Sequence, residues 1–215
     1  MKKFLCVIVG ILIVQNASAK IFIDNIHPFF GINGNINVPS YNMDLGEEAG
    51  IPFSTFSSEK THGAFGWGIE AGARFFKKSS IYQPGIRMFY DNLYDSTEIK
   101  IAFYDGAIHG DATHKIYGAA FDNHIRIGHN RQTNNVKVDD FLIIGAEFGG
   151  LSSTYTFDNV SGEAHENSRV YGATLGYLQE YKNGFGLFVT ARYLLTTSEA
   201  LEAVFSTKIG LRYTF

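Results

Sequence analysis

The chain has 215 residues, a formal net charge of −3 and a composition marked by 19 Phe, 12 Tyr and 23 Gly. Its length suffices for one domain, and the lack of a basic cluster argues against a nucleic-acid interface. A single cysteine excludes a disulfide framework, and a mean hydropathy of −0.04 argues against a bundle of membrane helices.

The N-terminal residues have the pattern of a cleaved secretory signal peptide. A basic start precedes an apolar run over 4–14, and an Ala-Ser-Ala motif places cleavage before Lys20. The apolar run is shorter than the roughly 20 residues that a membrane-spanning helix needs. We therefore expect a signal peptide over 1–19 and a single exported domain over 20–215.

Eight later segments alternate apolar with polar residues, which predicts β-strands with two unlike faces. Each segment is close to the length of a tilted membrane strand, which needs roughly 9–11 residues. The last segment ends with Tyr213 and Phe215 on one face, and with Arg212 and Thr214 on the other. The eight predicted strands span 28–38, 64–76, 81–91, 115–127, 141–150, 170–181, 185–195 and 204–215.

The connections between these segments broadly alternate between long and short. The long ones are polar and cover 39–63, 92–114 and 151–169. The short ones include a tight turn over 77–80 and the stretch 182–184, which carries the Asn-Gly signal of a primed hairpin. Long loops at one end and short turns at the other are typical of outer-membrane barrels.

Three stretches fit this alternation less well. The connection 128–140 is long for a turn, and 196–203 is short for an outer loop. The stretch 97–104 also alternates and could form a ninth strand, but bacterial single-chain barrels have an even number of strands. We interpret 97–104 as part of a hairpin arm projecting above the membrane. An even count also places both chain ends in the periplasm.

The outward rows of the predicted strands, which in the fourth strand run from Tyr117 to Ile127, contain no charged residue. They have aromatic residues near their ends, as expected for a face in contact with lipid. A basic residue at mid-depth on that face would cost about 2–4 kcal/mol, and a soluble lipocalin-type barrel would show the reverse distribution. We therefore predict an all-β transmembrane up-and-down antiparallel barrel of eight strands. The charges expected inside it are Glu70, Arg74, Arg87, Asp91, Asp122, Arg126, Glu147, Glu180, Arg192, Lys208 and Arg212.

The predicted lumen is narrow and nearly balanced in charge. Eight strands enclose a space that side chains can fill, and here six basic residues face five acidic ones. Buried charges require partners, so this balance indicates salt bridges across the lumen. We expect a lumen plugged by charged residues. The alternative is a narrow porin-like pore for ions or very small solutes, which needs an unfilled path.

The sequence offers little support for catalysis. Carboxylates inside a packed lumen would lack access to substrate, and no His-x-Ser pair is present for lipid hydrolysis. Omptin-like proteases have ten strands and longer chains. His109, Asp111 and His114 could bind a metal ion, but the polarity expected of a loop explains them equally well. We expect no enzymatic activity and no catalytic, cofactor-binding or metal-binding residues.

The signal peptide, the eight alternating segments and a terminal strand with Tyr213 and Phe215 resemble the small outer-membrane barrels of the OmpA, OmpX and opacity-protein type. These belong to the broad porin-family surface antigens of Gram-negative bacteria. The resemblance implies an outer-membrane location among lipid and lipopolysaccharide. It also implies folding by the barrel assembly machinery, which would read Tyr213 and Phe215. The implied role is structural or adhesive, with a host or envelope ligand at loops 39–63, 92–114 and 151–169.

Overall fold

The computed structural model describes residues 25–41, 64–76, 80–100, 107–133, 136–157, 163–198 and 201–215. These residues form eight β-strands, and none of them belongs to a helix long and apolar enough to cross a membrane. The strands are β1 (Ile26–Tyr41), β2 (Ala64–Phe75), β3 (Tyr82–Lys100), β4 (Ala107–Thr133), β5 (Val136–Phe157), β6 (Glu163–Tyr181), β7 (Phe185–Thr196) and β8 (Leu201–Thr214).

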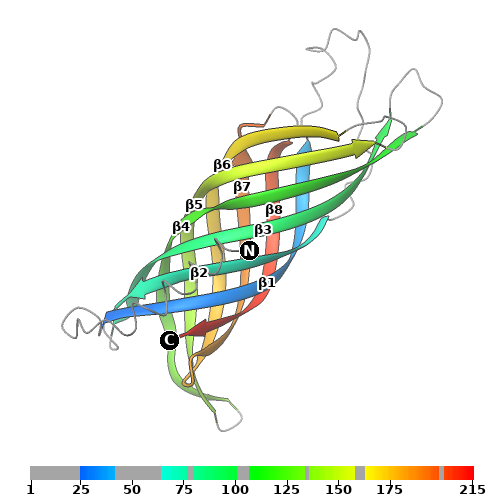
Figure 1. Ribbon diagram of the computed structural model, residues 1–215. Coiled ribbons are helices and arrows are strands. Elements are labelled where there is room, and N and C mark those ends of the chain that lie inside the picture. The colour runs from blue at the N-terminus through cyan, green and yellow to red at the C-terminus, as the bar shows by residue number, and fades with distance from the viewer. Residues whose placement is uncertain are drawn as a thin grey trace, which may run out of the picture.

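The eight strands form one closed antiparallel barrel (Figure 1). Each strand pairs with its neighbours in the chain, and β8 pairs with β1 to close the wall. The closing seam runs from Phe29 opposite Thr214 to Tyr41 opposite Leu201. Closure leaves no unpaired edge in the wall, which removes the usual site of strand-to-strand aggregation. The predicted fold class and strand number are confirmed.

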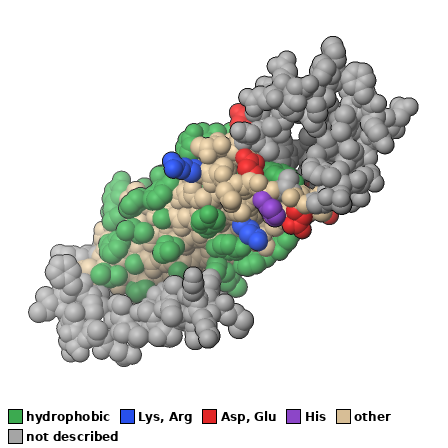
Figure 2. Space-filling model, turned by 45° about the horizontal axis from the view of Figure 1, so that its top comes forward, with side chains coloured by type: hydrophobic (Ala, Val, Ile, Leu, Met, Phe, Trp, Pro, Cys, Tyr) green, Lys and Arg blue, Asp and Glu red, His purple; other side chains and the backbone are tan. Residues whose placement is uncertain are grey.

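The two faces of each strand differ in the way that the alternation predicted. On β1, Ile32 and Ile36 on the outer face are 50% and 53% exposed, whereas Asn33 and Asn35 between them are 7% and 4% exposed. The space-filling view shows hydrophobic side chains spread along the flank of the barrel (Figure 2). The large exposed apolar residues that form this band include Phe30, Trp67, Ile86, Met88, Phe121, Ile144, Phe148, Leu175, Leu187, Val189, Phe205, Ile209 and Leu211.

Four strands extend well beyond their predicted lengths at the loop end of the barrel. Strands β3 to β6 have 19, 27, 22 and 19 residues, whereas β2 and β7 have 12 each. The predicted loops 92–114 and 151–169 are therefore wrong over most of their length. Their residues continue the strands because the backbone ladder persists through polar pairs such as Thr113 opposite Thr154.

These extensions form a four-stranded sheet beyond the rim, here called the outer sheet. It consists of 95–100, 107–114, 152–157 and 163–168, and its edge strands 95–100 and 163–168 lie beyond the last partners of β2 and β7, respectively. Figure 1 shows it projecting past the other strands. The stretch 97–104 lies partly here, since 97–100 belong to β3 and pair with β4, while 101–104 fall outside the described residues. The hairpin interpretation holds for 97–100, and the described residues contain no ninth strand.

The opposite, turn end of the barrel also differs from the sequence prediction in two places. The connection 128–140 is not a long turn, because β4 and β5 stay paired down to Thr133 opposite Val136, with irregular register near Gly128. At 182–184 only Gly184 has a positive φ, of 88°, so the connection is not a primed two-residue turn. The backbone amide of Gly184 donates to the carbonyl of Tyr181, as in a type I turn closed by a glycine.

The first described residues of β1 and the C-terminus lie together at this turn end. The amide of Phe215 donates to the carbonyl of Pro28 at 2.9 Å. The predicted loop 39–63 is described only over 39–41, and the tight turn over 77–80 only at its last residue. The aromatic residues of the terminal strand therefore lie at the end of the barrel where the connections are short.

Candidate functional site

The lumen holds the charged residues that the alternation assigned to it. Nine of the eleven are buried, each no more than 3% exposed, and the side chains of Arg126 and Glu180 are 10% and 15% exposed near the turn end. All point away from the apolar band because they occupy the opposite parity on their strands.

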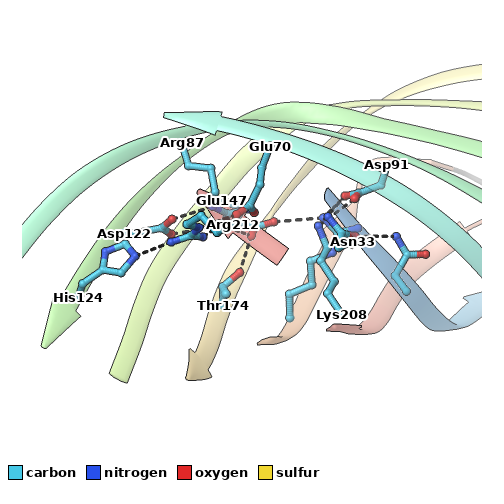
Figure 3. Close-up of polar contacts among 12 residues, drawn as sticks. Asn33, Glu70, Arg87, Asp91, Asp122, His124, Glu147, Thr174, Lys208 and Arg212 are labelled. Carbon is cyan, nitrogen blue, oxygen red and sulfur yellow. Dashed lines mark hydrogen bonds and ion pairs between the residues drawn. The ribbon is translucent and has the colours of Figure 1, made fainter. Parts of the chain in front are cut away.

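Arg87 on β3 joins carboxylates from three other strands (Figure 3). Its Nε lies 2.7 Å from Asp122 Oδ2 on β4, and its Nη2 lies 2.7 Å from Glu147 Oε1 on β5. Its Nη1 lies 3.5 Å from Glu70 Oε2 on β2. One guanidinium thereby neutralises charge from three directions, which its planar set of five N–H donors allows.

A second group of ion pairs is centred on Asp91 of β3. Its Oδ2 lies 2.7 Å from Arg192 Nη1 and 2.8 Å from Lys208 Nζ. Arg192 also reaches Glu147 at 3.4 Å, which connects this group to Arg87.

Arg212 on β8 completes the network through Glu70. Its Nη2 donates to Glu70 Oε1 at 2.6 Å, and its Nη1 lies 2.9 Å from His124 Nε2. The resulting central network contains four carboxylates and four cations. Such a balanced set offsets the desolvation that each buried charge would otherwise suffer. Its members are Glu70, Arg87, Asp91, Asp122, Glu147, Arg192, Lys208 and Arg212.

The remaining predicted charges form a separate set at the turn end. Arg74 Nη2 lies 2.5 Å from Glu180 Oε1 and 3.0 Å from Thr214 Oγ1, and Arg74 Nη1 donates to Gln83 Oε1 at 3.1 Å. Arg126 Nε lies 3.9 Å from Asp139, a residue that the sequence reasoning did not assign to the lumen. The structure therefore divides the eleven residues into a central network of eight and a turn-end set of three.

Aromatic rings inside the barrel also contact the cations, which the sequence reasoning did not anticipate. The charged groups of Arg87, Arg192 and Lys208 lie 5.6, 5.6 and 5.4 Å from the ring centre of Phe89. The Arg212 guanidinium lies 4.3 Å from the ring centre of Phe29. At these distances the ring faces attract the cations and add to the carboxylate contacts.

Two clusters of buried apolar residues lie on either side of the central network. The loop-end layer consists of Phe89, Leu93, Ile116, Ala120, Leu151, Val170, Leu194, Leu201 and Val204. The turn-end layer consists of Phe141, Ile143, Leu178 and Phe188. On β5, Glu147 lies between Ile143 and Leu151, and on β7, Arg192 lies between Phe188 and Leu194. The lumen is thus stacked as apolar, charged and apolar layers.

In the sequence, these layers are visible only as apolar residues at both ends of the inward-facing rows. Such residues show the same alternation whether they pack in a barrel lumen or in a soluble core, so the alternation did not reveal the layers. Glycines on the same rows make room for the network. A side chain at Gly68 would overlap Asp91, and one at Gly145 would overlap Asp122.

Two of the candidate metal residues, Asp111 and His114, are not brought together. Asp111 is exposed, whereas His114 is buried with its Nδ1 2.9 Å from Ser153 Oγ, because residues three apart on a strand point to opposite faces. The side chain of His109 lies outside the described part of the chain. Within that part, no group of three or more His, Cys, Asp or Glu residues could hold a metal ion.

No protein-family model matches the chain, and no curated protein matches it in sequence. Solved structures do match it. Ail, the attachment invasion locus protein of Yersinia pestis, in complex with the heparin analogue sucrose octasulfate, has 13% identity and a TM-score of 0.50, with 89% of this chain and 99% of that chain covered.

Neisserial surface protein A also matches, with 13% identity, a TM-score of 0.50 and coverage of 88% of this chain and 97% of that chain. The outer membrane protease OmpT from Escherichia coli matches with 12% identity and a TM-score of 0.42, covering 89% of this chain and 97% of that chain. The likenesses to Ail and to Neisserial surface protein A show that this chain has the fold of the small eight-stranded outer-membrane barrels.

Proposed function

We propose that this chain is an integral barrel of a Gram-negative outer membrane, with a sealed lumen and a contact surface at its loop end. The location is supported by the uncharged, exposed apolar band and by the charges confined to the lumen. The observation that carries the proposal is the stacking of apolar, charged and apolar layers inside the barrel.

This stacking favours a sealed barrel over the alternative of a pore. Ion conduction requires a continuous water path, and an interior of this strand number is narrow enough for side chains to close. Leu194 and Ile116 in the loop-end layer are 0% exposed, and Phe188 in the turn-end layer is 1% exposed. An ion crossing the lumen would have to displace both apolar layers and then compete with the paired charges between them.

Single-channel recording tests the sealed lumen. The refolded chain in a planar bilayer should give no steady openings. The double variant Arg87→Ala and Glu147→Ala should also stay closed, since both apolar layers remain. Adding Leu151→Ala, Leu194→Ala and Phe188→Ala should produce openings. Steady openings of the unmodified chain would overturn the proposal.

The outer sheet supports a role in contact with other molecules. Its two edge strands are the ends of β3 and β6, which pair with β4 and β5 on one side and extend past the last partners of β2 and β7 on the other. Such edges accept an additional strand from a partner. Exposed polar side chains such as His165 and Asn167 lie along one edge. A ligand for the chain would then bind strands at 92–114 and 151–169, where the sequence suggested loops.

A trimmed variant tests this contact surface. Residues 97–110 and 154–165 would each be replaced by Asn-Gly, which joins Ser96 to Asp111 and Ser153 to Glu166 by two-residue turns. Displayed on a non-adherent Gram-negative host, the full chain should confer adherence to cultured cells or to other bacteria, and the trimmed chain should lose it. The stretch 39–63 stays unchanged in both as the control. A full chain that confers no adherence would overturn the contact role.

A further inference from the structure

The turn end of the lumen opens into a basin with a volume of about 420 Å³. Its wall includes Arg74, Gln83, Arg126 and Glu180, which come from β2, β3, β4 and β6. Phe141 of the turn-end apolar layer forms part of the lining and separates the basin from the central network. Neither the sealing layers of the lumen nor the outer sheet forms this space.

The basin has an excess of positive charge. Arg74, Arg126 and Lys182 line it together with two carboxylates, Asp139 and Glu180. The lining also includes His27 and His129, and His129 Nδ1 lies 2.9 Å from Asp139 Oδ1.

Two of the guanidinium groups converge on one ring. The central carbons of Arg74 and Arg126 lie 5.3 and 5.6 Å from the ring centre of Phe141. Arg74 Nη2 lies 2.5 Å from Glu180 Oε1, and Arg126 Nε lies 3.9 Å from Asp139 Oδ2. An anion entering the basin would therefore meet two guanidinium groups beside the same ring.

Buried donors in the lining add a second, independent observation. Gln83 is 0% exposed, and its Oε1 accepts from Arg74 Nη1, which fixes its Nε2 as a donor. Neither Gln83 Nε2 nor Arg74 Nε has an acceptor among the described residues. A buried donor without an acceptor costs roughly 1–3 kcal/mol. These two groups therefore favour a guest that brings acceptor oxygens.

We infer that the basin binds a small oxyanion, a carboxylate or phosphate group carried by a larger molecule at the turn end. Gln83 and Arg74 donate to it from the floor, and Arg126 contributes charge from the wall. Bidentate pairing of guanidinium with carboxylate or phosphate is the strongest form of such recognition. In the proposed membrane orientation this group would come from the periplasm.

Side-chain NMR of the refolded barrel in micelles tests the inference. The resonances to follow are the Gln83 amide and the Arg74 Nε–H, during titration with acetate, inorganic phosphate or chloride at constant ionic strength. Acetate or phosphate should shift both resonances to saturation, and chloride should not. Tighter binding of phosphate than acetate would identify a phosphate-bearing ligand, and the reverse order a carboxylate-bearing ligand.

Matched variants separate a site from general attraction. Gln83→Leu and Arg126→Gln should each weaken binding about tenfold, the loss of one charge-assisted or buried hydrogen bond. Arg131→Gln removes the same charge from the same strand but lies outside the basin lining, so binding should stay within about twofold, as for an exposed residue. Retained heat-dependent mobility on gels would show that each variant folds. Absence of saturation with both oxyanions, or equal weakening by Arg126→Gln and Arg131→Gln, would overturn the site.

Discussion

Arg87 is the residue on which the largest number of buried charges depends. It ion-pairs with Glu70, Asp122 and Glu147, and all four side chains are at most 4% exposed. Glu70 and Glu147 have further cations in Arg212 and Arg192, but the structure gives Asp122 no other ion pair among the described residues. The stability of this part of the lumen therefore rests on one guanidinium.

Replacing Arg87 by Met should destabilise the barrel strongly. The variant keeps most of the side-chain volume but leaves Asp122 buried without a counter-charge, which costs about 3–5 kcal/mol. Urea unfolding of the barrel in lipid vesicles, followed by tryptophan fluorescence, measures the loss of free energy.

Arg131→Met is the matched comparison for this experiment. Arg131 also pairs with a carboxylate, Asp140, at 2.9 Å, but its own side chain is 54% exposed. Its replacement should cost no more than about 1 kcal/mol. Equal losses for Arg87→Met and Arg131→Met would contradict the role assigned to Arg87.

At the scale of elements, the sequence predicted the eight strands because a membrane wall imposes one rule on all of them. Every second residue must be acceptable to lipid, so charges collect on one parity, and Arg87 and Glu147 could be assigned to the lumen without a structure. The outer sheet escaped prediction because its strands no longer face lipid. Their Ser, Thr and Asn residues are typical of loops. The backbone hydrogen bonds that hold these strands together have little effect on amino-acid composition.

The partners within the lumen could not be predicted either. Which acid meets which base depends on strand tilt and stagger, which no single strand encodes. Glu70 meets Arg212 across 142 residues of chain, and Asp91 meets Lys208 across 117. Asp139 and Gln83 at the turn end were missed for the same reason, since their relevance arises only from the closed barrel.

The paired ends of β4 and β5 at the loop end of the barrel should lose stability in mild acid because of His114. This residue lies on β4 outside the stretch 115–127 expected to cross the membrane, is 1% exposed, and has its pKa lowered to about 4 by burial. The unfolded chain takes up the proton near pH 6.5, so stability falls as the pH drops from 6.5 towards 4. The loss should reach about 3 kcal/mol near pH 4.

Hydrogen exchange of the amides in 107–114 and 152–157 at pH 7 and pH 4.5 measures this local effect. Carboxylates titrate in the same range, so the variant His114→Gln serves as the reference. The variant should show a smaller loss of protection between the two pH values than the unmodified chain. Identical pH dependence in both chains would exclude His114 as the cause.

For the whole molecule, Tyr213 and Phe215 allow folding in the cell to be tested separately from the stability of the folded barrel. Phe215 is 52% exposed and its ring lies 5.0 Å from that of Tyr213, outside the wall. The double variant Tyr213→Ala and Phe215→Ala removes no lumen contact. Its free energy of unfolding after refolding in micelles should change by no more than about 2 kcal/mol, as for partly exposed aromatic contacts.

In a Gram-negative host the same variant should accumulate less folded protein, because we propose that the assembly machinery reads these two residues. Comparison of heated and unheated samples on gels gives the folded fraction. Phe185→Ala, which removes another ring in contact with Tyr213, is the matched control and should fold normally. A normal folded fraction for the double variant would remove the proposed signal.

The long-range ion pairs of β8 have a consequence for the order of folding events. Lys208 and Arg212 lie on β8, which follows the other seven strands of the barrel in the chain, and they neutralise Asp91 and Glu70 on the earlier strands β3 and β2. Until β8 arrives, those two carboxylates lack these cations and favour contact with water. Contacts between residues so far apart in the chain also form slowly, because the chain must lose conformational entropy to close the loop before these contacts form. Completion of the ion-pair network and closure of the wall are therefore one late, cooperative step, and a barrel that lacks β8 has neither.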